Sequence, residues 1–146
     1  MPAAEASPVK PTTYDYALIR VVPRVERGEF INVGVIVACH AQRYLAARFE
    51  LIEPRLLALD PTLDLDALRA HLQGLVAICD GGPDSGPIGR LPQRERFHWL
   101  VAPRSTVIQT SPVHTGHCSA PGAVLDRLMD RMVRPLAGVD ATDHAT

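Results

Sequence analysis

Two apolar stretches near the start of the chain, residues 14–22 and 30–39, constrain its fold more than any other feature. The first is rich in aromatic and β-branched residues, which predicts a β-strand. The second is almost entirely apolar, as expected of a central strand that is covered on both faces. Pro23 ends the first strand because it has no backbone N–H, and Gly28 can supply the positive φ of a tight turn. We therefore expect the two stretches to form an antiparallel hairpin.

Two later stretches extend the predicted sheet. Residues 44–51 alternate apolar and polar side chains, which indicates a third strand with one half-exposed face. Residues 105–110 are rich in β-branched residues and also alternate, so they are predicted to be a fourth strand. Residues 111–116 are expected to leave that strand as a turn. The first three strands should form a meander, but the sequence does not fix where the fourth one pairs.

Helical patterns follow the third strand. Asp64 is a suitable cap for a helix over residues 65–80, whose apolar side chains form one stripe. A short helix is expected at residues 93–101, with a strand as the alternative, and a last helix at 121–134 with Met132 on its inner face. The predicted class is α+β: a small, mainly antiparallel sheet with helices packed on one face.

The length and composition indicate one globular domain. Hydrophobic residues make up 47% of the 146 residues and charged residues 21%, and the net charge of −1 favours neither nucleic acid nor membrane as a partner. We expect the domain to span residues 13–134, between disordered tails at 1–12 and 135–146. The three widely spaced cysteines do not suggest a disulfide framework, and no secretory signal or membrane-spanning run is present, so a cytoplasmic protein is expected.

Polar residues within the first two apolar stretches need an explanation. Burying the charge of Arg20 costs several kcal/mol unless a partner compensates it, and Glu29 and Asn32 are the nearest candidates in the sequence. These residues could form a structural ion pair at the end of the hairpin or one wall of a polar pocket. Gly34, inside the second stretch, predicts a β-bulge or the close approach of another backbone.

A second polar group surrounds the predicted fourth strand, at Arg104, Ser105, Gln109 and His114. Guanidinium, hydroxyl, amide and imidazole groups are typical of anion recognition. Both groups would line one pocket if the fourth strand paired beside the hairpin. Alternatively, Arg104 pairs with Glu29 or a helix C-terminus, and Ser105 holds a turn. The candidate anion-binding residues are Arg20, Arg24, Glu29, Asn32, Arg104, Ser105 and His114.

Metal or nucleophilic chemistry is a weaker interpretation. His114, His117 and Cys118 could combine with Cys39 or Cys79 as zinc ligands, but their spacing fits no standard finger. No nucleophile elbow or cysteine-protease pattern is present. We expect no metal and no cofactor, and the sequence leaves open whether the protein is an enzyme, with a non-enzymatic role favoured.

Two other interpretations concern the loop at residues 80–92 and the segment that follows it. The loop is rich in glycine and proline and is typical of a connector or lid, or of a phosphate cradle without the Walker ending. In the next segment, arginines at 90, 94, 96 and 104 interleave with Phe97 and Trp99, a pattern that suits single-stranded nucleic acid. Phe97 also fits a core stripe, so nucleic acid is not the favoured partner.

Two sequence blocks, YDYALIRVVPRVERGEFINVGVIV and the later RERFHWLVAPRSTVIQTSPVHTG, resemble a bacterial family called domain of unknown function 3037. The resemblance covers roughly residues 13–134 and implies no particular reaction. It does imply an accessory or partner role, since genes of this family often lie beside a kinase resembling the HipA toxin. The polar pattern of the family is matched by Arg20, Pro23, Arg24, Glu29, Asn32, Gly34, Arg96, Arg104, Ser105 and His114.

The leading functional hypothesis is a non-enzymatic protein that binds an anionic small molecule or a protein partner. Arg20, Arg104 and His114 would meet the ligand, while Glu29 and Asn32 would orient them. The main alternative is a metal-independent phosphodiesterase or other hydrolase, in which His114 acts as base and Arg104 stabilises the developing negative charge. Two further alternatives are a protein that binds single-stranded nucleic acid and an interaction module without a pocket.

Overall fold

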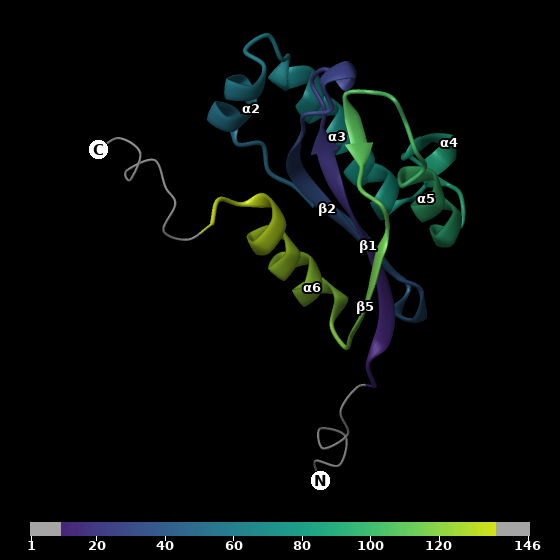
Figure 1. Cartoon of the computed structure of the whole chain (residues 1–146). Coiled ribbons are helices and arrows are strands. Elements are labelled where there is room, and N and C mark those ends of the chain that lie inside the picture. The colour runs from purple at the N-terminus through teal and green to yellow at the C-terminus, as the bar shows by residue number, and fades with distance from the viewer. Residues whose placement is uncertain (1–9, 137–146) are drawn as a thin grey trace.

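The computed structural model describes residues 10–136 and contains an open antiparallel sheet of five strands. Strands β1 (Thr12–Val21), β2 (Ile31–Cys39) and β3 (Tyr44–Phe49) form a meander. The other side of β1 pairs with two short strands, β4 (Ile108–Thr110) and β5 (His114–Cys118) (Figure 1). The α+β class, the meander and a fourth strand are confirmed, and β4 lies directly beside the hairpin.

The expected turn at residues 111–116 is wrong in its second half, because β5 begins at His114. Strand β1 has ten residues, and β4 pairs with only three of them, Ile19 to Val21. The remaining backbone groups of β1 need partners, and β5 supplies them from Thr12 to Tyr16. The pairing of β5 therefore follows from the length of β1, whereas its own sequence carries little of the apolar alternation that marks a strand.

Ser111 bridges the gap between β4 and β5. Its backbone N–H donates to the carbonyl oxygen of Leu18 at 2.8 Å, and its Oγ accepts from the N–H of Leu18 at 2.8 Å. Both residues are buried. The serine hydroxyl thus takes the place of a backbone carbonyl where the edge of the sheet is interrupted.

We expect Ser111→Ala to lower the free energy of unfolding by about 1.5 kcal/mol, because the buried N–H of Leu18 loses its acceptor. Urea denaturation of the wild type and the variant measures this difference. Ser105→Ala is the matched control, since Ser105 is exposed and its substitution should change stability by less than about 0.5 kcal/mol. Equal stability of all three proteins would contradict the bridging role of Ser111.

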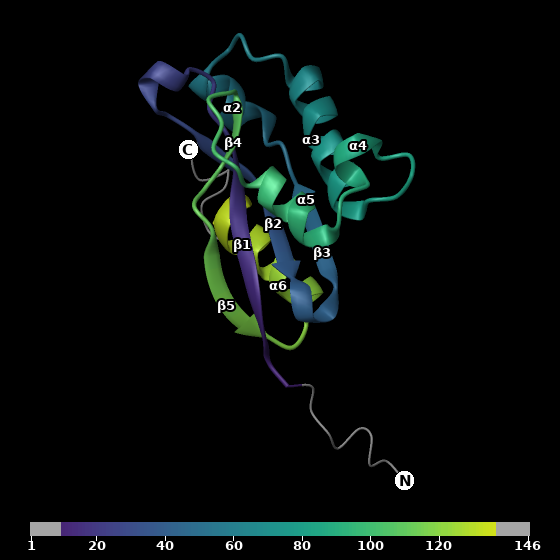
Figure 2. The ribbon, with the colours of Figure 1, turned by 90° about the vertical axis from the view of Figure 1, so that its right-hand side faces the viewer.

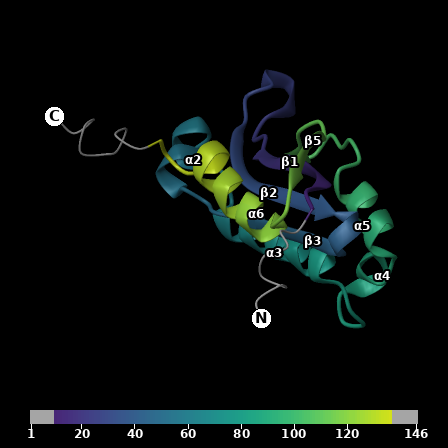
Figure 3. The same cartoon turned by 90° about the horizontal axis from the view of Figure 1, so that it is seen from below.

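Helices cover both faces of the sheet, which corrects the expectation that they pack on one face. Helices α2 (Glu53–Leu59), α3 (Leu65–Asp80) and α5 (Gln93–Leu100) bury their apolar side chains against one face. Helix α6 (Pro121–Leu128) packs on the opposite face, and so does the π-helical turn η3 (Met129–Val133). Figures 2 and 3 show α5 and α6 on different sides of the strands.

Strand β2 explains why both faces are covered. Seven consecutive residues from Val33 to Cys39 are buried, and successive side chains of a strand point to opposite faces. Ile36 packs with the helices α2, α3 and α5, whereas Val35 and Val37 pack with α6. An all-apolar strand can satisfy both faces only if each has its own helical layer.

The end of the last helix differs from its prediction as well. The N–H of Arg134 donates to the carbonyl oxygen of Met129 at 3.0 Å, which closes the wide turn of a π-helix. This turn places Met129 and Val133 in the core and leaves Met132 exposed. Met132 is therefore not on the inner face, because the wider turn shifts the register of the helix.

Three short helical segments complete the described chain: η1 (Val25–Arg27), η2 (His40–Gln42) and α4 (Gly86–Gly89). The predicted tails fall largely at residues 1–9 and 137–146, outside the described residues. Between residues 10 and 136, every helix is too short or too polar to cross a membrane.

Candidate functional site

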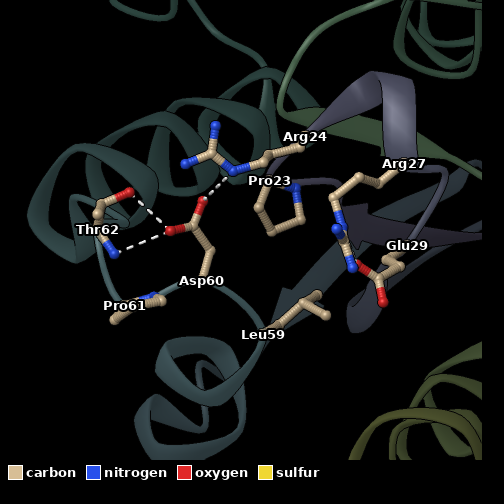
Figure 4. A pocket seen from close by; sticks show the side chains of 8 residues that line it. All are labelled: Pro23, Arg24, Arg27, Glu29, Leu59, Asp60, Pro61 and Thr62. Carbon is tan, nitrogen blue, oxygen red and sulfur yellow. Dashed lines mark hydrogen bonds and ion pairs between the residues drawn. The ribbon is translucent and has the colours of Figure 1, made fainter.

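A cavity of about 350 Å³ lies where the turn between β1 and β2 meets the corner between α2 and α3 (Figure 4). The local sequence explains the backbone of both segments that line the cavity. Pro23 follows the end of β1, η1 continues the turn, and Gly28 closes it with a φ of 71°. Asp60 ends α2 in an extended conformation, followed by Pro61. The cavity is lined by Pro23, Arg24, Arg27, Glu29, Leu59, Asp60, Pro61 and Thr62.

Asp60 is the buried polar anchor of this cavity, with only 7% of its surface exposed. Its Oδ1 accepts from the Oγ1 of Thr62 at 2.6 Å and from the backbone N–H of Thr62 at 2.9 Å. The Oδ2 lies 3.6 Å from the Nε of Arg24. The hydrogen bonds from Thr62, more than the charge of Arg24, lower the pKa of Asp60. This carboxylate therefore stabilises the fold above its ordinary pKa, and the contribution is lost as the pH falls through the lowered value.

A second arginine–carboxylate pair stands across the cavity. The Nε of Arg27 donates to Oε1 of Glu29 at 2.5 Å, and this hydrogen bond lowers the pKa of Glu29. Figure 4 shows Arg24 with Asp60 on one side of Pro23, and Arg27 with Glu29 on the other. Within residues 10–136, the terminal Nη atoms of Arg24 and Arg27 have no hydrogen-bond partner. Each guanidinium group thus has a carboxylate beside its Nε, hydrogen-bonded for Arg27 and at ion-pair distance for Arg24, and no partner at its outer nitrogens among the described residues.

Arg20 and Asn32 lie elsewhere, as neighbours across β1 and β2. The guanidinium of Arg20 sits 4.1 Å from the ring centroid of Phe30, and Asn32 donates to the carbonyl oxygen of Met132 at 3.3 Å. Because β4 pairs beside β1, Gln109 lies opposite Arg20. Glu29, a candidate partner of Arg20, accepts from Arg27 instead. Arg20 Nε and Asn32 Oδ1 are buried and have no partner within the described range.

Arg104 caps the end of a helix. It donates to the carbonyl oxygens of Trp99 at 2.5 Å, Leu100 at 3.0 Å and Ala102 at 3.2 Å, and its guanidinium stacks 4.4 Å from the Trp99 ring centroid. Orphan carbonyls at a helix C-terminus are satisfied in this way by a nearby cation. The arrangement matches the alternative in which Arg104 pairs with a helix C-terminus. Ser105 follows in the exposed loop.

His114 is separated from Arg104 by the sheet. In β5 it lies opposite Tyr16 of β1, with 5.2 Å between the ring centroids. Tyr16 packs against the apolar cluster on the face of the sheet that α6 covers. The guanidinium of Arg104 lies at the end of α5, a helix that packs on the opposite face. The structure therefore does not bring Arg20, Arg104 and His114 into one pocket.

The cavity combines two of the predicted site residues with others that the sequence does not single out. Arg24 and Glu29 are among the predicted candidates, whereas Arg27, Asp60 and Thr62 are not. One local signal is available, since Asp60 and Thr62 flank Pro61 in the Asx-type turn that ends α2. Nothing in the sequence indicates that this turn lies against the β1–β2 hairpin.

Two of the three cysteines, Cys39 and Cys79, are buried, and Cys118 is partly exposed. Within residues 10–136, no three histidine, cysteine or acidic side chains are grouped so that they could hold a metal ion. Burial raises the pKa of the Cys79 thiol to about 12, and burial also raises the pKa of Cys118. Neither thiol is poised as a thiolate at neutral pH.

The residues that could suit nucleic acid mostly serve the fold. Phe97 is 2% exposed and belongs to the core. Arg96 donates to the carbonyl oxygens of Leu91, Ile78 and Cys79. Arg104 also donates to backbone carbonyls, so two of the four arginines in this pattern serve helix ends.

Comparison with known proteins gives one positive result. No curated protein and no solved structure matches the chain. The sequence profile of the family described as "Protein of unknown function (DUF3037)" matches residues 16–133, which include the second part of β1, the whole of β2, the cavity and the two arginines that cap helices. The chain therefore belongs to the DUF3037 family.

Proposed function

We propose that this protein is a non-catalytic binding protein whose ligand presents an anionic group to the cavity between the β1–β2 turn and the α2–α3 corner. One observation carries the proposal: Arg24 and Arg27 line the same cavity, each paired at Nε with a carboxylate. Their Nη groups remain able to donate two parallel hydrogen bonds to a carboxylate or phosphate. Orientation before binding reduces the entropy lost when the ligand is held.

The cavity has the size of a small-molecule site. Its volume of about 350 Å³ falls near the lower end of the range, about 300–1,000 Å³, that is typical of ligand pockets. Pro23, Leu59 and Pro61 supply apolar walls between the charged groups. A ligand with a short carbon skeleton and a charged end would use both kinds of surface.

The lining of the cavity favours binding over catalysis. Among residues 10–136, the lining includes no histidine, cysteine or serine, and its only side-chain hydroxyl, on Thr62, donates to Asp60. A general base works best with a pKa near the ambient pH, whereas hydrogen bonds lower the pKa values of Glu29 and Asp60. The hydrolase alternative would use His114 and Arg104, which lie on opposite faces of the sheet.

The test is a binding panel with small anions. Phosphate, sulfate, acetate, butyrate and succinate should be compared by thermal shift and calorimetry against wild-type protein and Arg24→Ala. We expect at least one anion to raise the melting temperature of the wild type and to bind Arg24→Ala about tenfold more weakly, corresponding to about 1.4 kcal/mol.

Arg69→Ala is the matched control for this experiment. Arg69 pairs with Glu53 at 3.7 Å, much as Arg24 pairs with Asp60 at 3.6 Å, but it lies outside the cavity. Its loss should leave anion binding unchanged. If Arg24→Ala and Arg69→Ala bind every anion as well as the wild type, the proposed site is wrong.

A further inference from the structure

The cavity carries equal numbers of positive and negative side chains. Arg24 and Arg27 are balanced by Glu29 and Asp60, so the site has no net charge. A ligand that is only anionic would be attracted by the guanidinium groups and repelled by the nearby carboxylates. A ligand that carries charges of both signs avoids this repulsion, provided that its positive group meets a carboxylate with a free oxygen.

The two carboxylates differ in the room they leave for a ligand. Asp60 is buried, its Oδ1 accepts two hydrogen bonds from Thr62, and its Oδ2 faces Arg24. Glu29 has a side chain that is 45% exposed, and only its Oε1 is used, by Arg27. Within residues 10–136, Oε2 of Glu29 has no hydrogen-bond partner. Glu29 is therefore the carboxylate that can accept a hydrogen bond from a bound cation.

The separation of the two pairs suggests how such a ligand would lie. The Arg24–Asp60 pair and the Arg27–Glu29 pair flank Pro23, with Leu59 below it (Figure 4). An anionic group at Arg24 and a cationic group at Glu29 would thus be joined across an apolar floor. Methylene groups suit that floor, since prolyl and leucyl side chains offer no hydrogen bond.

We infer that the ligand is a small amino carboxylate, with its carboxylate on the Nη groups of Arg24, its ammonium on Oε2 of Glu29, and its carbon chain against Pro23 and Leu59. This inference rests on the proposed function and specifies its ligand class. It assigns Glu29 a direct contact with the ligand, whereas Asp60 only positions Arg24.

Matched pairs of ligands test the inference. Propionate, butyrate and hexanoate should be compared by calorimetry with β-alanine, 4-aminobutyrate and 6-aminohexanoate, which add only the terminal ammonium group. We expect at least one amino carboxylate to bind the wild type about tenfold more tightly than its plain partner. In Glu29→Gln that advantage should disappear, because the amide oxygen can still accept from Arg27 but no longer carries charge.

Two controls separate this inference from the proposed function. Glu26→Gln removes an exposed charge from the same turn, outside the cavity lining, and should keep the advantage of the amino carboxylates. If plain and amino carboxylates bind the wild type equally and both depend on Arg24, the inference fails while the anion site stands. If neither series binds, and phosphate and sulfate do not bind either, both proposals are wrong.

Discussion

Replacing Gly34 by alanine is expected to lower the free energy of unfolding by about 3 kcal/mol. A Cβ at this position would lie 2.5 Å from the carbonyl oxygen of Arg48 and 3.0 Å from both Cδ1 of Ile19 and Cβ of Phe49. The closest of these atoms is backbone in the neighbouring strand β3, which cannot move without disturbing the ladder between β2 and β3. The substitution therefore has to push strands apart in the middle of the core.

A second glycine serves as the matched control. Gly74 lies within α3 and is exposed, and a Cβ added there would have no packing neighbour within 4 Å. Alanine at this position should therefore stabilise the protein by about 1 kcal/mol through helix propensity. Urea denaturation would measure the free energy of unfolding of both variants, and thermal unfolding should show a fall in melting temperature of roughly 10 °C for Gly34→Ala. Similar effects of the two substitutions would show that the close contact at Gly34 is unimportant.

Gly34 also shows how far the hairpin could be predicted from sequence. A glycine inside an apolar strand suggests a bulge or a close backbone approach, and both are present. The pairing shifts register between Ile19 and Arg20, so that Ile19 lies opposite Gly34 but Arg20 lies opposite Asn32. The prediction succeeds because it depends only on local backbone chemistry, which one residue type is enough to reveal.

Features that depend on distant partners are harder to predict. Strand β5 forms because β1 offers unpaired backbone groups, and its own residues contribute no clear apolar pattern. The placement of α6 on the second face follows from the burial of β2 on both sides, which the apolar run does indicate. The exposure of Met132 depends on one wide turn at the end of α6, and the spacing of apolar residues does not distinguish that turn from a regular one.

The candidate site is predictable only in part, for the same reason. Residue types suitable for anion recognition are recognisable, but their partners are set by tertiary structure. Arg24 and Glu29 reach a cavity because α2 ends beside the hairpin. Arg104 has the same side chain as Arg24, but its guanidinium donates to carbonyl oxygens at the end of α5. The sequence shows that an arginine is present. Whether its guanidinium can bind a ligand depends on whether unpaired carbonyl oxygens of a nearby helix end already accept its hydrogen bonds.

Arg96 joins three segments of the chain through hydrogen bonds to backbone carbonyl oxygens. Its Nε donates to the carbonyl oxygen of Leu91 at 2.9 Å, and its Nη1 donates to those of Ile78 at 2.8 Å and Cys79 at 2.7 Å. It thus satisfies the end of α3 and the loop before α5 together. The guanidinium also fills the space beside Gly81, where a Cβ would lie 2.8 Å from Nη1.

We expect Arg96→Ala to lower the free energy of unfolding by about 3 kcal/mol, because three carbonyl groups lose a charged donor at a partly buried helix end. Arg96→Lys should recover only part of this loss, since an ammonium group cannot reproduce the planar fork of a guanidinium. Arg94→Ala, at an exposed position of the same helix, should cost less than about 0.5 kcal/mol.

Urea denaturation and the anion-binding panel should be applied to all three variants. Unchanged stability of Arg96→Ala together with lost anion binding would place Arg96 in a ligand site. Lost stability with unchanged affinity of the remaining folded protein would show that Arg96 serves the fold.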